Sequence, residues 1–128
     1  MAIEHGLRST LRRTVGGADS AAAVGSGDLA VLATPRLLAW MEAATVAAVS
    51  GHLLPGQTTV GTRVRLEHTR GTALGVEVEV SAELVHVDGR LLRFEVVAVD
   101  DASSVLGRAE VTRVVVDADR FVARLLNS

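Results

Sequence analysis

One apolar helix between two clear end signals constrains the fold of this chain more than any other stretch. Residues 34–50 read TPRLLAWMEAATVAAVS, and nearly every position is apolar or small. Thr34 is a good N-cap, and Pro35 suits the first helical position, where its missing N–H costs nothing. Gly51 is a plausible stop after the last turn. A helix that is apolar on all sides is typically buried on most of them.

Glu42 is an acidic residue in the middle of this apolar helix. A carboxylate buried there without a partner would be unfavourable, so it needs a partner, a proton or a wet cleft. Glu42 is therefore the first candidate functional residue. The alternative is that its side chain simply reaches solvent at the edge of the fold.

Length and composition exclude several classes of function. The 128 residues fit one domain, residues 1–128, and the net charge of −2 and 2% aromatic content give no basis for nucleic-acid binding. The chain has no cysteine, and its four histidines lack metal-ligand spacing, so we expect no metal and no cofactor. Neither a signal peptide nor a long uninterrupted apolar span is present, which predicts a cytoplasmic protein without membrane contact.

The remainder of the chain favours strands. Residues 58–69 alternate, with His68 at the end of the mainly apolar face that also holds Val60, Thr62, Val64 and Leu66. Similar alternation follows in residues 75–86, 90–99 and 105–116, with a hairpin signal at Asp88-Gly89. We expect an antiparallel meander packed on the helix, an α+β fold, with a further strand at residues 5–15 and a short amphipathic helix at residues 117–126.

Residues 16–28 read GGADSAAAVGSGD and are typical of a long loop with room for one short turn in it. Long loops in compact domains often act as lids or binding loops, although plain disorder is about as common. Glycines at both ends of the small apolar stretch, residues 21–24, favour a mobile flap.

Glu42 and His68 lie on elements that should pack face to face. An acid and an imidazole in a partly apolar cleft suit general acid–base or nucleophilic chemistry near neutral pH. Each has a simpler interpretation alone: a backbone carbonyl can satisfy a strand histidine, and Thr34 can be only a helix cap.

The stretch from Val31 to Thr69, VLATPRLLAWMEAATVAAVSGHLLPGQTTVGTRVRLEHT, resembles acyl-CoA thioesterases of the hotdog fold, in which an antiparallel sheet wraps around one long central helix. It is most similar to the fluoroacetyl-CoA thioesterase branch. That resemblance implies catalytic roles for Thr34 before the helix, Glu42 within it and His68 at the end of the next strand. Arg113 also matches the branch, whereas Val111 replaces its usual histidine. The loop lacks the aromatic, proline-rich lid of that branch.

The resemblance implies a homodimeric thioesterase that hydrolyses a small acyl-CoA, with CoA present only as part of the substrate. Glu42 would be the nucleophile or the general base, His68 would move the proton, and Thr34 would bind the carboxylate or the substrate. Thr34 and Glu42 lie roughly 12 Å apart along a helix, so the site can draw on both chains. The alternative is a non-catalytic hotdog module that binds acyl-CoA or a hydrophobic ligand. A hotdog hydratase is disfavoured because no matching histidine–aspartate pair is found.

Overall fold

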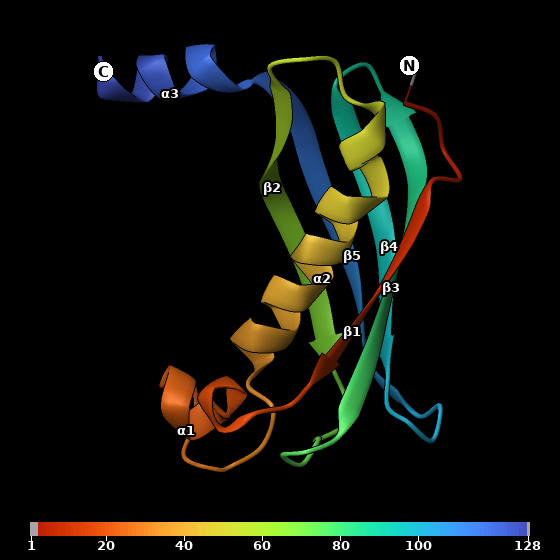
Figure 1. The fold of residues 1–128 in the computed structure, drawn as a ribbon, viewed down its shortest axis with the longest axis vertical. Coiled ribbons are helices and arrows are strands. Elements are labelled where there is room, and N and C mark those ends of the chain that lie inside the picture. Colours follow the sequence, from red (N-terminus) through yellow and green to blue (C-terminus); the bar gives the residue numbers. More distant parts are fainter. Residues whose placement is uncertain (1–2, 128) are drawn as a thin grey trace.

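A long helix, α2 (Thr34–Val49), lies diagonally across one face of an antiparallel sheet in the computed structural model, which describes residues 3–127 (Figure 1). The strands of the sheet are β1 (Arg8–Thr14), β2 (Gln57–His68), β3 (Glu77–Asp88), β4 (Leu91–Val99) and β5 (Val105–Asp117). The shorter helices are η1 (Gly17–Asp19), α1 (Ala21–Val24), η2 (Ser50–His52) and α3 (Ala118–Leu126). The α+β architecture with a sheet wrapped around one helix is confirmed.

The strand order across the described residues is β1-β3-β4-β5-β2, and every neighbouring pair is antiparallel. The meander prediction is correct for β3, β4 and β5. It is wrong for β2, which pairs with β5 and not with β3. After His68 the chain crosses to the other side of the sheet, where β3 begins beside β1. β2 is consequently an edge strand whose outer backbone groups are free to pair with another strand.

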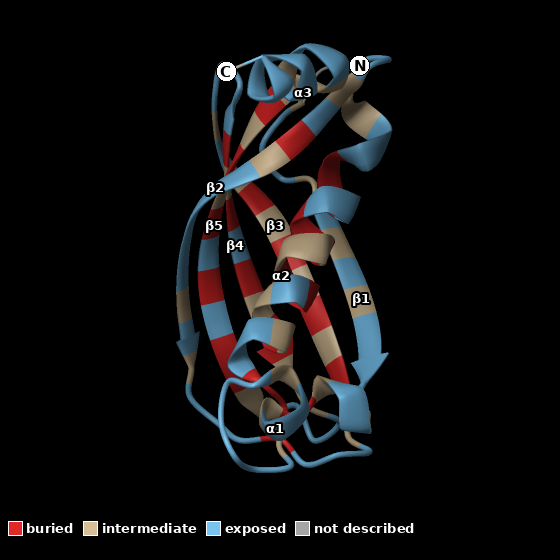
Figure 2. Ribbon diagram, turned by 90° about the vertical axis from the view of Figure 1, so that its left-hand side faces the viewer, coloured by how far each residue is buried: buried red, intermediate tan, exposed pale blue. Residues whose placement is uncertain are grey.

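Alternation along the central strands builds the core (Figure 2). β3 and β4 bury the residues that their patterns predicted, including Val80 and Phe94, which are fully covered. Strict alternation over residues 105–116 predicts that Val105 faces inward together with Ala109 and Val111, but Leu106 is the buried residue because the pairing of β4 with β5 shifts register there. Burying a large apolar side chain contributes about 1.5–3 kcal/mol, so these bands hold α2 against the sheet.

The helix α2 is buried on one side only. Its sheet-facing side carries the covered residues Leu37, Trp40, Met41, Ala44, Thr45, Ala48 and Val49. Pro35, Ala39, Val46 and Ala47 are exposed on the other side, so the expectation of burial on most sides is wrong for a single chain. An apolar helix face is thus left in solvent beside the free edge of β2. No helix among residues 3–127 has the length and apolar character needed to cross a bilayer.

The segment predicted as a long loop, residues 16–28, contains η1 and α1. Ser20 caps α1, because its Oγ accepts a hydrogen bond from the Ala23 N–H at 3.1 Å. Asp19 ties the segment to α2: its backbone carbonyl accepts from the Ala33 N–H at 2.9 Å, and its carboxylate lies 3.1 Å from Arg36 Nε. The tail forms the expected helix α3, preceded by Asp117 at the N-cap position.

Candidate active site

Thr34 and His68 meet at one end of the molecule. Thr34 Oγ1 lies 2.7 Å from His68 Nδ1, although the residues belong to the first turn of α2 and the last position of β2. The N-cap prediction for Thr34 is wrong: Ala33 occupies that position, without a side-chain cap, and Pro35 is one residue further into the helix than expected. The Thr34 hydroxyl binds the imidazole instead of a helix N–H.

The other ring nitrogen of His68 is poised for a partner. Nε2 is buried and makes no hydrogen bond with any described residue. Burial lowers the pKa of His68 from its usual value of 6.5, and the neighbouring backbone of Arg70 offsets part of this lowering. The ring is therefore neutral near pH 7. When Nδ1 carries the proton and donates it to Thr34, the Nε2 lone pair can accept a proton.

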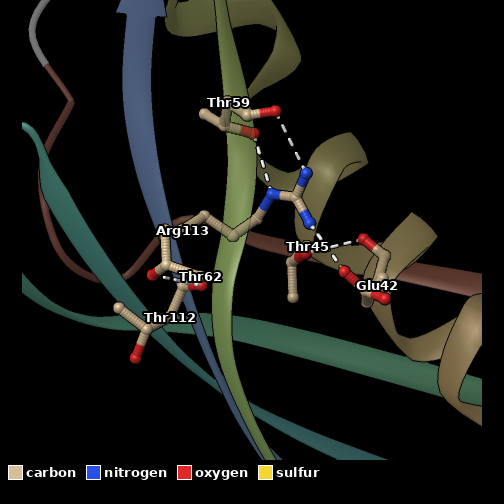
Figure 3. Close-up of polar contacts among 6 residues, drawn as sticks. All are labelled: Glu42, Thr45, Thr59, Thr62, Thr112 and Arg113. Atoms are coloured by element: carbon tan, nitrogen blue, oxygen red, sulfur yellow. Dashed lines mark hydrogen bonds and ion pairs between the residues drawn. The ribbon is translucent and has the colours of Figure 1, made fainter. Parts of the chain in front are cut away.

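Glu42 lies on α2 in a second polar cluster, with Arg113 of β5 and Thr59 of β2 (Figure 3). Arg113 Nη1 donates to Glu42 Oε2 at 3.2 Å, while Nε and Nη2 donate to Thr59 Oγ1 at 2.8 Å and to the Thr59 carbonyl at 3.1 Å. Arg113 is 7% exposed, whereas the Glu42 side chain is 37% exposed. The carboxylate therefore has a cationic partner and also reaches solvent, so Glu42 is not the unpaired buried charge that its place in an apolar helix would make unfavourable.

A β-bulge in β2 explains how one strand serves both clusters. The pairing of β2 with β5 shifts register between Gly61 and Arg63, so Thr62 is an extra residue. Before the bulge, Thr59 and Gly61 face α2; after it, Leu66 and His68 do. The predicted face of even-numbered residues is thus correct only for the second half of the strand.

Gly61 lies directly against the ion pair. A Cβ atom at this position would be 2.8 Å from Glu42 Oε2 and 3.4 Å from Arg113 Nη1. Only a residue without a side chain leaves the carboxylate where it is. Sequence reasoning overlooked Gly61 and Thr59. For Arg113 a signal existed, because alternation in β5 places this charged residue inward between Val111 and Val115.

The three predicted catalytic residues divide into two groups within one chain. Thr34 and His68 are in contact, but no hydrogen bond or ion pair joins either of them to Glu42 among the described residues. A hollow of about 290 Å³ adjoins the first pair; Ala21 and Ser26 of the 16–28 segment line it together with Arg70. Across the described residues, no cluster of three or more acidic, histidine or cysteine side chains is arranged to hold a metal ion.

Comparison with known proteins identifies the family. The profile of the fluoroacetyl-CoA-specific thioesterase family (FlK) matches residues 15–119. A fluoroacetyl-CoA thioesterase from Streptantibioticus cattleyicolor is 36% identical over 95 residues, 74% of this chain and 68% of that protein. The chain belongs to the FlK family. It is a thioester hydrolase with a hotdog fold, as the resemblance implied.

Solved structures agree with this assignment over the whole chain. The fluoroacetyl-CoA thioesterase FlK superposes with a TM-score of 0.90 at 30% identity, covering 100% of this chain and 98% of the other. A Thermus thermophilus member of the thioesterase superfamily reaches a TM-score of 0.91 at 20% identity, covering 98% of this chain and 93% of the other. At that identity the second match supports the fold alone.

Proposed function

We propose that this chain hydrolyses a small acyl-CoA to the free acid and CoA at a site made of Thr34, Glu42 and His68. Acyl-CoA thioester hydrolysis follows from membership of the FlK family. The choice of residues is supported chiefly by the 2.7 Å contact between Thr34 and His68, which orients a neutral imidazole whose buried Nε2 has no partner among the described residues. CoA enters as part of the substrate, and we propose that no separate cofactor takes part.

The chemistry that we propose uses water as the second substrate. If Glu42 is the nucleophile, it attacks the thioester carbonyl and expels the CoA thiolate, and water then hydrolyses the resulting mixed anhydride and regenerates the Glu42 carboxylate; His68 Nε2 takes one proton from this water and gives it to the thiolate. If Glu42 is the general base, it removes that one proton from the water that attacks the thioester, and the proton passes through His68 Nε2 to the departing thiolate. In both routes the products are a carboxylic acid and a thiol. The N–H groups of the first turn of α2 can stabilise the oxyanion of the tetrahedral intermediate, since a helix N-terminus favours negative charge.

We propose a homodimer in which Glu42 of one subunit approaches the Thr34–His68 pair of the partner subunit. Two observations support this arrangement: the free edge of β2, and the exposed apolar side of α2 next to it. Both are surfaces that a second copy would cover. A two-fold axis near the middle of β2 would also bring opposite ends of the two strands together, and with them Glu42 and His68 from different chains.

The proposed acyl group is small. The support from the structure is the limited volume of the hollow beside Thr34 and His68, about 290 Å³. Solved structures of mutant FlK contain acetyl-CoA in one case and fluoroacetate with CoA in another. Residues 16–28 contain no aromatic residue, so the proposed substrate is a small acyl-CoA in general and not specifically a fluorinated one. A cytoplasmic location stays a prediction from the sequence.

The direct test is thiol release from a panel of acyl-CoAs with short, branched, aromatic and long acyl groups. We expect turnover of the short-chain members by the wild-type protein and at least about a hundredfold lower kcat for Glu42→Gln, the usual scale for a general acid–base group. Binding of acyl-CoA without turnover would favour the non-catalytic alternative. Full activity of Glu42→Gln would exclude Glu42 as nucleophile or base.

A further inference from the structure

We propose that Thr59 is a positioning residue: it holds the Arg113 guanidinium so that Nη1 fixes the orientation of the Glu42 carboxylate. The inference rests on the proposed catalytic role of Glu42, and it assigns a task to a residue that touches no reacting group. Figure 3 shows the Arg113 side chain extending from β5 past β2 toward α2, with Thr59 on one side and Glu42 on the other.

The first step is the geometry of the guanidinium. Nε and Nη2 both donate to Thr59, one to the hydroxyl at 2.8 Å and one to the carbonyl at 3.1 Å. Two bonds from adjacent nitrogens of a planar group to one residue fix both its position and its plane. The remaining nitrogen, Nη1, is then directed at Glu42 Oε2, 3.2 Å away.

The second step is burial. Thr59 and Arg113 are each 7% exposed, so the hydroxyl and the guanidinium have little access to water. A buried charged donor without an acceptor is strongly unfavourable, and hydrogen bonds in such surroundings hold their geometry well. Strand packing alone does not require a threonine here, since valine has nearly the same shape and an equally good strand propensity. What threonine adds over valine at this position is the hydroxyl that accepts a hydrogen bond from Arg113 Nε.

The third step concerns Glu42 itself. Among the described residues, its carboxylate is hydrogen-bonded and ion-paired to Arg113 alone, while the nearby Thr45 hydroxyl donates to the Glu42 backbone carbonyl. With 37% of the side chain exposed, packing alone does not hold the carboxylate in one orientation. Its position therefore depends on Arg113, and through Arg113 on Thr59.

The test compares Thr59→Val with Thr59→Ser. We expect Thr59→Val to lower kcat by about tenfold or more with KM changed by less than about twofold, because misplaced catalytic groups affect the transition state rather than ground-state binding. Thr59→Ser keeps the acceptor and should retain nearly wild-type kcat. Thr72→Val is the matched control, since this buried hydroxyl has no hydrogen-bond partner among the described residues. Wild-type kcat in Thr59→Val, or an equal loss in both Thr59 variants, would overturn the proposal.

A spectroscopic measurement separates this inference from the proposed reaction. The Nε–H resonance of Arg113 in the wild-type protein should exchange slowly with solvent, because the group is buried and bound to Thr59 Oγ1. Slow exchange should persist in Thr59→Ser and be lost in Thr59→Val. If the protein cleaved no acyl-CoA, the catalytic proposal would fail while this signal still reported whether Thr59 holds Arg113. Fast exchange in the wild-type protein would contradict the inference even if Thr59→Val failed to fold.

Discussion

Replacement of Gly61 by alanine should damage catalysis while leaving the fold intact. The added Cβ would lie 2.8 Å from Glu42 Oε2, whereas ordinary contact begins at 3.4 Å. The carboxylate must therefore move by roughly half an ångström, which lengthens or breaks its 3.2 Å bond to Arg113. Since a displacement of about 1 Å can reduce a rate about a hundredfold, we expect kcat to fall about 10- to 100-fold.

The stability effect of the same change should be small. Arg113 keeps its two hydrogen bonds to Thr59 in this variant, and the displaced Glu42 carboxylate, whose side chain is 37% exposed, stays in contact with solvent, so weakening the ion pair should cost only about 1 kcal/mol. Alanine also restricts the unfolded chain more than glycine does, which offsets about 0.4–1 kcal/mol. The Tm should therefore change by only a few degrees.

The assay is thiol release by Gly61→Ala at saturating acyl-CoA, with Tm measured on the same sample. Gly51→Ala is the control, because a Cβ there meets nothing within 4 Å. Wild-type kcat in Gly61→Ala would refute the reasoning that close approach of the strand to Glu42 matters. So would an equal loss in the Gly51 control.

Further expectations concern the catalytic pair and the lid. His68→Ala should lower kcat at least about a hundredfold, and the double variant with Glu42→Gln should be little worse than the poorer single one, as measured by thiol release. Thr34→Val should lower kcat with little change in Tm, because the hydroxyl binds His68 and caps no helix N–H; a large loss of Tm would contradict this. Because the pKa of His68 is lowered in the folded protein, the unfolded chain binds a proton at His68 more readily as the pH falls through about 6.5. The free energy of unfolding therefore decreases with falling pH. The Tm of the wild type minus that of His68→Gln should therefore fall from about pH 8 to about pH 5, and a constant difference would refute it. Amides of residues 21–24 should exchange hydrogen faster than those of α2 and slow down when a substrate analogue binds; equal exchange with and without the analogue would count against a lid.

Most of the fold could be predicted from the periodicity of apolar residues and from helix end signals. An apolar stretch with a proline near its start predicted α2, and alternation predicted β3 and β4 with their inward residues. Glu42 and His68 could be selected because an acid within an apolar helix and an inward strand histidine both violate the expected pattern. Such violations are informative since burying them is unfavourable without a purpose.

The remaining features depend on contacts that local sequence does not encode. The bulge at Thr62 changes which side chains of β2 face the helix. The alternation of residue types continues unbroken through Thr62, so the sequence does not reveal the bulge. Ala33 precedes α2 although Thr34 is the better cap by propensity, because the Thr34 hydroxyl is engaged by His68 from a distant strand. The position of β2 at the sheet edge likewise follows from its pairing with β5.

Mixing two inactive variants tests most directly the central claim that the site combines Glu42 of one subunit with His68 of the partner subunit. Glu42→Gln and His68→Ala are purified separately, mixed in equal amounts under conditions that allow subunit exchange, and assayed for thiol release. Each mixed dimer would contain one site with both defects and one intact site. Random exchange should therefore restore about a quarter of wild-type activity in a two-fold symmetric dimer. No recovery after demonstrated exchange would show that Glu42 and His68 do not act together across the interface.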